Sequence, residues 1–90
     1  MRRIVWTDEA RAGLVGIQAY IDQFNPSAAQ RLGARLVAAA ESLADYPDVG
    51  RRVQGRIREL TFVRPYVIRY TVLEDRVVIL RIRHGARRPD

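Results

Sequence analysis

The sequence predicts an α+β domain in which a short strand and two antiparallel helices precede a three-stranded antiparallel sheet. Two observations carry this prediction. In the first half of the chain, apolar residues recur every three or four positions, which is typical of helices packed through one face. Beyond Gly50 the apolar residues alternate with polar ones instead, which is typical of strands. The expected order is therefore β-α-α-β-β-β in a single domain, residues 1–90.

A strand at residues 2–6 is expected to lead into the first helix. Thr7 suits the N-cap of that helix, and Asp8 and Glu9 place negative charge in its first turn, where the helix dipole favours it. The apolar stripe of this helix comprises Ala10, Leu14, Ile17, Ile21 and Phe24.

The dipeptide Asn25-Pro26 ends the first helix and begins the second, since Asn is a strong N-cap and Pro fits the first helical position. The second helix runs to Tyr46-Pro47. Two helices of roughly 18 to 21 residues with so short a connection must lie antiparallel. The stripe of the second helix comprises Ala29, Leu32, Leu36, Ala39, Leu43 and Tyr46.

After a loop at residues 47–50, strands are expected at residues 56–63, 66–73 and 77–83. Alternation assigns to the helix side Leu60, Phe62, Tyr66, Ile68, Tyr70, Val72, Val78, Leu80 and Ile82. The other side takes Glu59, Thr61, Val63, Val67, Arg69, Thr71, Val77, Ile79, Arg81 and Arg83. This second face is half apolar and half arginine, which indicates a partner segment across the strands or along an edge. The alternative is the apolar exposure that is ordinary for a small domain.

The charge of the chain is +6, and all sixteen basic residues are arginines. Arginine binds carboxylate and phosphate through a planar fork but is a poor general base. An acidic protein partner and nucleic acid both fit, and an arginine-rich genome would explain the lack of lysine equally well. Because the chain has no cysteine and one histidine, His84, we expect neither a metal site nor a cofactor. No apolar run approaches the roughly 18 residues of a membrane span, so a cytoplasmic location without membrane contact is expected.

The C-terminal strand ends in the most promising functional cluster, where arginines surround a residue that titrates near neutral pH. An equally good interpretation is that His84 caps the edge of the core. Arg51 and Arg52 are interpreted as a solvated loop, with contact to an acidic partner as the alternative.

Several motifs occur together in a specific order and spacing. They are Val5-Trp6-Thr7 with Ala10 and Leu14; Ala28-Ala29 with Leu32; Leu43 with Pro47, Gly50 and Arg51; Arg58-Glu59-Leu60; Tyr66-Val67-Ile68 with Tyr70; and Val78, Leu80-Arg81-Ile82, His84-Gly85 and Arg87. In this arrangement the chain resembles the RelE/ParE superfamily, the toxins of type II toxin–antitoxin modules. The resemblance implies a β-α-α-β-β-β fold and a small acidic antitoxin that wraps around the toxin in a hetero-oligomer.

The family divides into ribosome-dependent mRNA endonucleases, similar to RelE, and DNA gyrase inhibitors, similar to ParE. A nuclease would use Glu59 as base and His84 as acid, with Arg87 completing the catalytic set. Arginines would hold the phosphate, and Tyr66 or Tyr70 would stack a base. However, Glu59, Thr61 and Val63 stand where the nuclease branch has basic residues, and Val67 stands where it has an arginine. The chain also ends in Arg88-Pro89-Asp90, where that branch has an aromatic residue.

Tyr66-Val67-Ile68 and His84-Gly85 are more similar to the gyrase-directed branch, which needs a recognition surface and no catalytic set. The resemblance therefore favours a non-enzymatic gyrase inhibitor, with the ribosome-dependent mRNA endonuclease as the alternative. A plain nucleic-acid-binding module is a third reading, based on the charge. The candidate residues for contact with target or antitoxin are Arg51, Arg58, Val67, Arg69, Ile79, Arg81 and Arg83.

Overall fold

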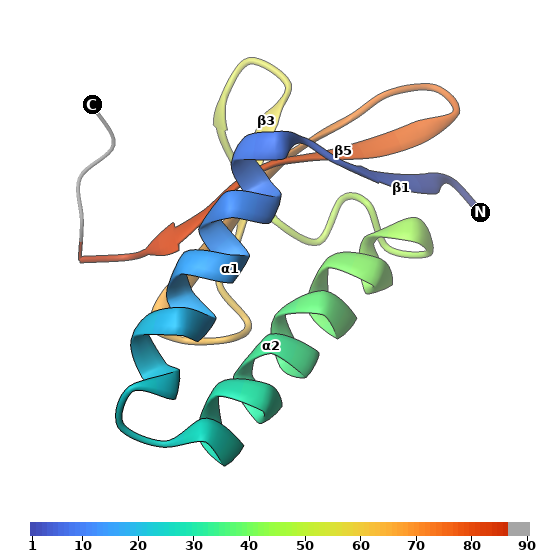
Figure 1. The fold of residues 1–90 in the computed structure, drawn as a ribbon. Coiled ribbons are helices and arrows are strands. Elements are labelled where there is room, and N and C mark those ends of the chain that lie inside the picture. The colour runs from blue at the N-terminus through green and yellow to red at the C-terminus, as the bar shows by residue number, and fades with distance from the viewer. Residues whose placement is uncertain (87–90) are drawn as a thin grey trace.

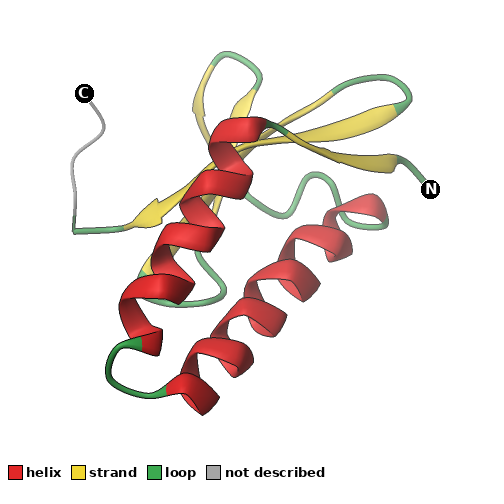
Figure 2. Cartoon of the chain, in the orientation of Figure 1, coloured by secondary structure: helices red, strands yellow, loops and turns green. Residues whose placement is uncertain are grey.

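A computed structural model describes residues 1–86, in which two helices lie side by side against one face of a sheet (Figures 1 and 2). The elements in chain order are β1 (Arg3–Trp6), α1 (Asp8–Asp22), α2 (Pro26–Glu41), the 3₁₀ helix η1 (Ser42–Ala44), β2 (Arg51–Gln54), β3 (Ile57–Leu60), β4 (Tyr66–Val72) and β5 (Arg76–His84). The predicted α+β class and the helical hairpin are confirmed. Neither helix in this part of the chain is long and apolar enough to cross a membrane.

The sheet has the strand order β1-β5-β4-β3-β2. Strand β1 pairs parallel to β5, and the other neighbours are antiparallel. The helical hairpin thus connects β1 at one edge of the sheet to β2 at the other edge, and it crosses one face of the sheet. Strand β5 therefore lies between β1 and β4.

Strand β2 was not expected, and the interpretation of Arg51 and Arg52 as a loop is wrong. Both residues lie in this four-residue strand, which is paired only with β3 and has three exposed positions. An edge strand that buries little side chain lacks the alternation by which strands are recognised in a sequence. The hairpin turn that follows uses Gly55 at φ +55°, a conformation that favours glycine.

The helix caps follow the sequence closely. The Thr7 hydroxyl accepts from the Ala10 amide at 3.0 Å, and the Asn25 side chain accepts from the Ala28 amide at 3.0 Å. The helices end earlier than predicted, however, at Asp22 and Glu41. Phe24 and Tyr46 therefore lie beyond the helices and are exposed, so their assignment to the apolar stripes is wrong.

The core lies between the hairpin and the sheet, and its largest fully buried side chain is Tyr70. The Tyr70 hydroxyl accepts from the Gly50 amide at 2.8 Å and donates to the Pro47 carbonyl at 2.8 Å. Burial raises the pKa of this hydroxyl, and the hydrogen bond from Gly50 opposes the shift. A side chain at Gly50 would collide with the Tyr70 ring, since its Cβ would lie 2.5 Å from the hydroxyl oxygen. The loop before β2 is thus fastened to the centre of the sheet.

A β-bulge in β5 changes which residues face the helices. Arg69 pairs with Arg81 and Tyr70 pairs with Ile79, so Leu80 is an extra residue in β5. As a result Val77 and Ile79 are fully buried on the helix side, and Val78 lies with Thr71 on the other side. The predicted faces of residues 77–79 are therefore wrong. Phe62 was also expected in the core but is exposed, because β3 ends at Leu60.

Candidate functional site: the open face of the sheet

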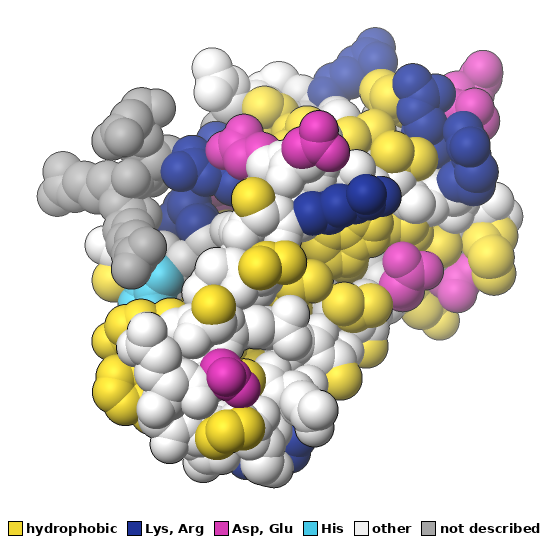
Figure 3. Space-filling view, in the orientation of Figure 1, with side chains coloured by type: hydrophobic (Ala, Val, Ile, Leu, Met, Phe, Trp, Pro, Cys, Tyr) yellow, Lys and Arg dark blue, Asp and Glu magenta, His cyan; other side chains and the backbone are white. Residues whose placement is uncertain are grey.

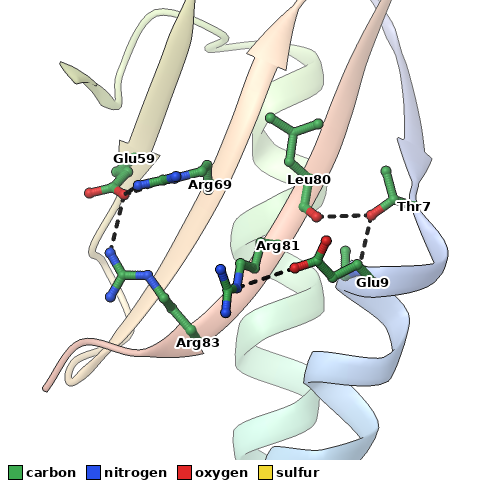
Figure 4. Close-up of polar contacts among 8 residues, drawn as sticks. Thr7, Glu9, Glu59, Arg69, Leu80, Arg81 and Arg83 are labelled. Carbon is green, nitrogen blue, oxygen red and sulfur yellow. Dashed lines mark hydrogen bonds and ion pairs between the residues drawn. The ribbon is translucent and has the colours of Figure 1, made fainter. Parts of the chain in front are cut away.

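A row of charged residues crosses four strands on the side of the sheet away from the helices. Figure 4 shows the part of the row on β3, β4 and β5. Register pairs Arg51 with Glu59, Glu59 with Arg69, and Arg69 with Arg81, and residues paired in this way share a face. Arg83 lies on the same face, paired with Val67 on β4. We call these residues, Arg51, Glu59, Val67, Arg69, Arg81 and Arg83, the open face. Four of them are cations and one is an anion.

Glu59 lies at the centre of the open face and forms ion pairs with two arginines, Arg69 and Arg83 (Figure 4). Its Oε2 accepts from Nη2 and Nε of Arg69 at 2.7 and 3.1 Å, and from Nη2 of Arg83 at 3.3 Å. The side chains of Glu59, Arg83 and Arg69 are only 9%, 14% and 26% exposed, although no helix covers this side. Two arginines thus share one largely buried carboxylate oxygen, and charge-assisted hydrogen bonds of this kind are strong.

The two outer arginines of the row are held less firmly. Arg81 Nε lies 3.4 Å from Oε2 of Glu9 in the first turn of α1, and both side chains are exposed. Such a surface ion pair stabilises little. Arg51 is exposed and has no ion-pair partner among residues 1–86. These arginines therefore remain accessible to an external anion.

His84 lies on the opposite side of the sheet from Glu59. It pairs with Tyr66, whose ring it contacts edge-on at a centroid distance of 5.5 Å, and Tyr66 shares the helix side with Ile68 and Tyr70. Nδ1 of His84 accepts from the Ala86 amide at 3.1 Å. The third predicted catalytic residue, Arg87, lies outside the described residues. The structure therefore does not bring the predicted base and acid together.

A groove of about 960 Å³ lies beside the contact between helix α1 and the end of β5. Its walls include Gly13 and Gly16 of α1, and His84 with Tyr66 on the sheet. A Cβ at Gly13 would lie 2.4 Å from the Ile82 carbonyl oxygen, so glycine permits the close approach of helix and strand. Arg81 and Arg83 also line the groove, which therefore adjoins the open face. Figure 3 shows charged side chains gathered over the sheet end and mainly hydrophobic or uncharged ones over the visible face of the hairpin.

Of the other predicted contact residues, Arg58 and Ile79 lie on the helix side of the sheet and Val67 lies on the open face. Arg58 lies on the helix side, where Nη1 donates to the carbonyls of Gly50 and Asp48 at 2.8 and 3.2 Å. Ile79 is fully buried, so the expectation that it faces outward is wrong. Val67 is on the predicted face but nearly buried. The predicted binding roles of the open-face arginines remain predictions.

Two residues of this region were not singled out by sequence reasoning. Glu9 was interpreted only as a first-turn acid that favours the helix dipole, yet it also reaches Arg81. Gly13 carried no signal, because a single glycine within a helical pattern does not reveal what packs against it. Within residues 1–86, no group of acidic or histidine side chains could hold a metal ion.

Comparison with known proteins identifies the family of this chain. The family model described as the ParE toxin of type II toxin–antitoxin system, parDE, matches residues 4–89. The chain belongs to this family. It is a type II toxin, and such a toxin has an antitoxin partner. The resemblance noted from the sequence motifs is thereby confirmed.

The relatives of the toxin carry both family labels. It is 54% identical to "Toxin RelE2" of Caulobacter vibrioides over 97% of this chain and 99% of the relative. It is 44% identical to "Putative toxin Y4kP" of Sinorhizobium fredii over 93% and 88% of the two chains. A solved structure titled "Chromosomal ParDE TA system from P. aeruginosa" matches the toxin with a TM-score of 0.83 and 26% identity, over 93% of this chain and 96% of that chain.

Proposed function

We propose that this toxin arrests growth by binding DNA gyrase in the cytoplasm, and that a small acidic antitoxin neutralises it by covering part of the surface described above. The observation that carries the proposal is the separation of Glu59 from His84 by the sheet. The membership of the chain in the ParE toxin family supports it.

The chemistry of RNA cleavage explains why this separation matters. Attack by a 2′-hydroxyl needs a base beside that hydroxyl and an acid beside the leaving oxygen of the same phosphate. Glu59 and His84 project from opposite sides of the sheet, so one phosphate cannot reach both. Glu59 also has its Oε2 engaged by two arginines. What residues 1–86 offer is a set of binding groups, which suits an inhibitor that recognises a protein.

The alternative function is ribosome-dependent cleavage of mRNA. Two observations favour it: relatives at 54% and 36% identity carry the name RelE, and the open-face arginines could hold a phosphate. In that case the base and acid would have to come from other residues than the pair predicted here.

Titration of purified toxin into a gyrase supercoiling reaction, with detection of cleaved complex, tests the proposal. We expect supercoiling to stop and cleaved complex to accumulate, and added antitoxin to restore activity. The variant His84→Ala should retain most of the inhibition, because no proton transfer is required of it. Full gyrase activity at saturating toxin, together with cuts in mRNA on translating ribosomes, would refute the proposal.

A further inference from the structure

The β-hairpin made of β2 and β3, residues 51–60, concentrates positive charge in one short segment. Its residues 51–58 contain four arginines and no acidic residue, which gives them a formal charge of +4 against +6 for the whole chain. Figure 1 shows this β-hairpin, coloured yellow beside the label β3, at the opposite end of the molecule from the connection between α1 and α2. A protein surface with charge of one sign attracts ligands of the opposite sign.

Three of these arginines are available to an external anion. They are exposed, and none has an ion-pair partner within residues 1–86: Arg51, Arg52 and Arg56. Arg51 lies beside Glu59 in the register, but Oε2 of Glu59 accepts from Arg69 instead. The β-hairpin therefore offers anion-binding groups that ion pairs within the fold do not already use.

The base of the β-hairpin is fixed to the rest of the sheet. The amide of Gly50, which precedes β2, donates to the Tyr70 hydroxyl at 2.8 Å, and the Gly50 carbonyl accepts from Nη1 of Arg58 at 2.8 Å. The fourth arginine, Arg58, is only 20% exposed and thus serves the fold. A support that is already ordered loses less conformational entropy when a ligand binds. The β-hairpin is therefore a pre-organised carrier for the three exposed arginines.

The exposed arginines are distributed over both faces of the β-hairpin and its turn. Arg51 pairs with Glu59 and lies on the open face, whereas Arg52 pairs with Arg58 and lies on the helix side. Arg56 lies in the turn that joins the two strands. A flat ligand on one face would contact only part of this set. A ligand that flanks the β-hairpin on both sides would contact all of it.

Duplex DNA in the B form is a ligand of this shape. Because β3 is paired with β4 on its other side, the β-hairpin can enter a groove only with the β2 edge and the turn leading. Its two faces then meet the two walls of the groove. A sheet with its side chains is about 10 Å thick, and the major groove of B-DNA is about 12 Å wide with a phosphate chain along each side. The major groove of A-form RNA is too deep and narrow for side chains to read.

We propose that the β-hairpin is a DNA-contact element, in which Arg51, Arg52 and Arg56 bind the phosphates that border the major groove of B-form duplex DNA. The binding itself requires no second protein. Its use in growth arrest rests on the proposed function, because gyrase acts on duplex DNA and a toxin bound to gyrase can bring the β-hairpin to that DNA.

Salt-dependent binding of purified toxin to a fluorescent DNA duplex of about 20 base pairs tests the proposal, since each phosphate contact contributes about 0.9 to the slope of log K against log salt. The triple variant Arg51→Gln/Arg52→Gln/Arg56→Gln should have a slope shallower than that of the wild type by about 2.7. Between about 50 and 200 mM salt, the wild type should therefore lose about 40-fold more affinity than the variant. Arg56→Gln alone, which changes only the turn, should make the slope shallower by about 0.9.

The matched control removes the same charge from the helices. The triple variant Arg11→Gln/Arg31→Gln/Arg35→Gln replaces three exposed arginines of α1 and α2. It should change the slope by less than about 0.9, the value of one contact. Equal changes for the two triple variants would show that DNA senses only the net charge, and this result would overturn the proposal. Absence of DNA binding by the wild type at about 50 mM salt would overturn it as well.

An RNA duplex of the same base sequence distinguishes the two kinds of nucleic acid. It should bind about tenfold more weakly than the DNA duplex, because the A-form major groove does not admit the β-hairpin. Equal or tighter binding of RNA would overturn the assignment to B-form DNA. None of these measurements contains gyrase, so their failure leaves the proposed function standing. Conversely, a toxin that binds DNA as expected but leaves gyrase active would refute the proposed function alone.

Discussion

Replacement of Tyr70 by phenylalanine removes one oxygen atom from a fully buried side chain. That oxygen accepts from the Gly50 amide and donates to the Pro47 carbonyl, both at 2.8 Å. An orphaned buried donor costs about 1 to 3 kcal/mol, while the hydroxyl itself no longer has to be desolvated. We therefore expect Tyr70→Phe to lower the free energy of unfolding by about 2 kcal/mol. For a domain of this size that corresponds to a fall of about 8 to 16 °C in Tm.

Urea unfolding followed by circular dichroism measures this change, and Tyr66→Phe is the matched control. The Tyr66 hydroxyl has no hydrogen bond within residues 1–86, and this side chain is only partly buried. Its replacement should alter stability by less than about 0.5 kcal/mol. If both variants unfold at the same urea concentration, the Tyr70 hydroxyl does not fasten the loop to the sheet and the reasoning is refuted.

Three further predictions concern stability. Gly13→Ala should destabilise the fold by about 2 kcal/mol, because the added Cβ would meet the Ile82 carbonyl oxygen. Gly16→Ala is the control: its Cβ would have no neighbour within 4 Å, so this variant should be neutral or stabilise by up to about 1 kcal/mol. Equal Tm values for the two variants would contradict this prediction. Burial raises the pKa of Tyr70 in the folded state, so the contribution of its hydroxyl to the free energy of unfolding is complete below about pH 10 and is lost as the pH rises further. The stability of the wild type should therefore fall more steeply above about pH 10 than that of Tyr70→Phe. Parallel pH profiles for the two proteins would exclude this cause. Glu59→Gln should cost about 1 to 3 kcal/mol by chemical denaturation, since it removes the negative charge from a largely buried carboxylate that accepts hydrogen bonds from Arg69 and Arg83. Glu9→Gln should cost less than about 0.5 kcal/mol, and the reverse order would show that the central ion pairs do not stabilise the sheet.

Local signals in the sequence were enough for much of the fold. Thr7 and the pair Asn25-Pro26 mark helix starts by their own chemistry, and both side chains cap as expected. Alternation also placed Glu59 and Arg69 on one face, where they form an ion pair. Features of this kind depend on residues close together in the chain or on the fixed period of a strand.

The remainder depended on contacts between distant segments. The extra residue in β5 at Leu80 arises where the strand leaves β1 and where the Thr7 hydroxyl donates to the Leu80 carbonyl at 2.9 Å, so no pattern within β5 announces it. For the same reason the proposed pairing of Glu59 with His84 looked feasible in the sequence, although register puts the two residues on opposite sides. Strand β2 went unrecognised because it buries almost nothing.

We propose that this toxin acts by binding its target and does not use Glu59 and His84 as a catalytic pair. Counting events per toxin molecule tests this most directly, in parallel reactions with gyrase and with mRNA on translating ribosomes. We expect gyrase inhibition to saturate near one toxin per target site and no mRNA to be cut at toxin concentrations far below that of the ribosomes. Many mRNA cleavages per toxin molecule, with gyrase unaffected, would contradict it.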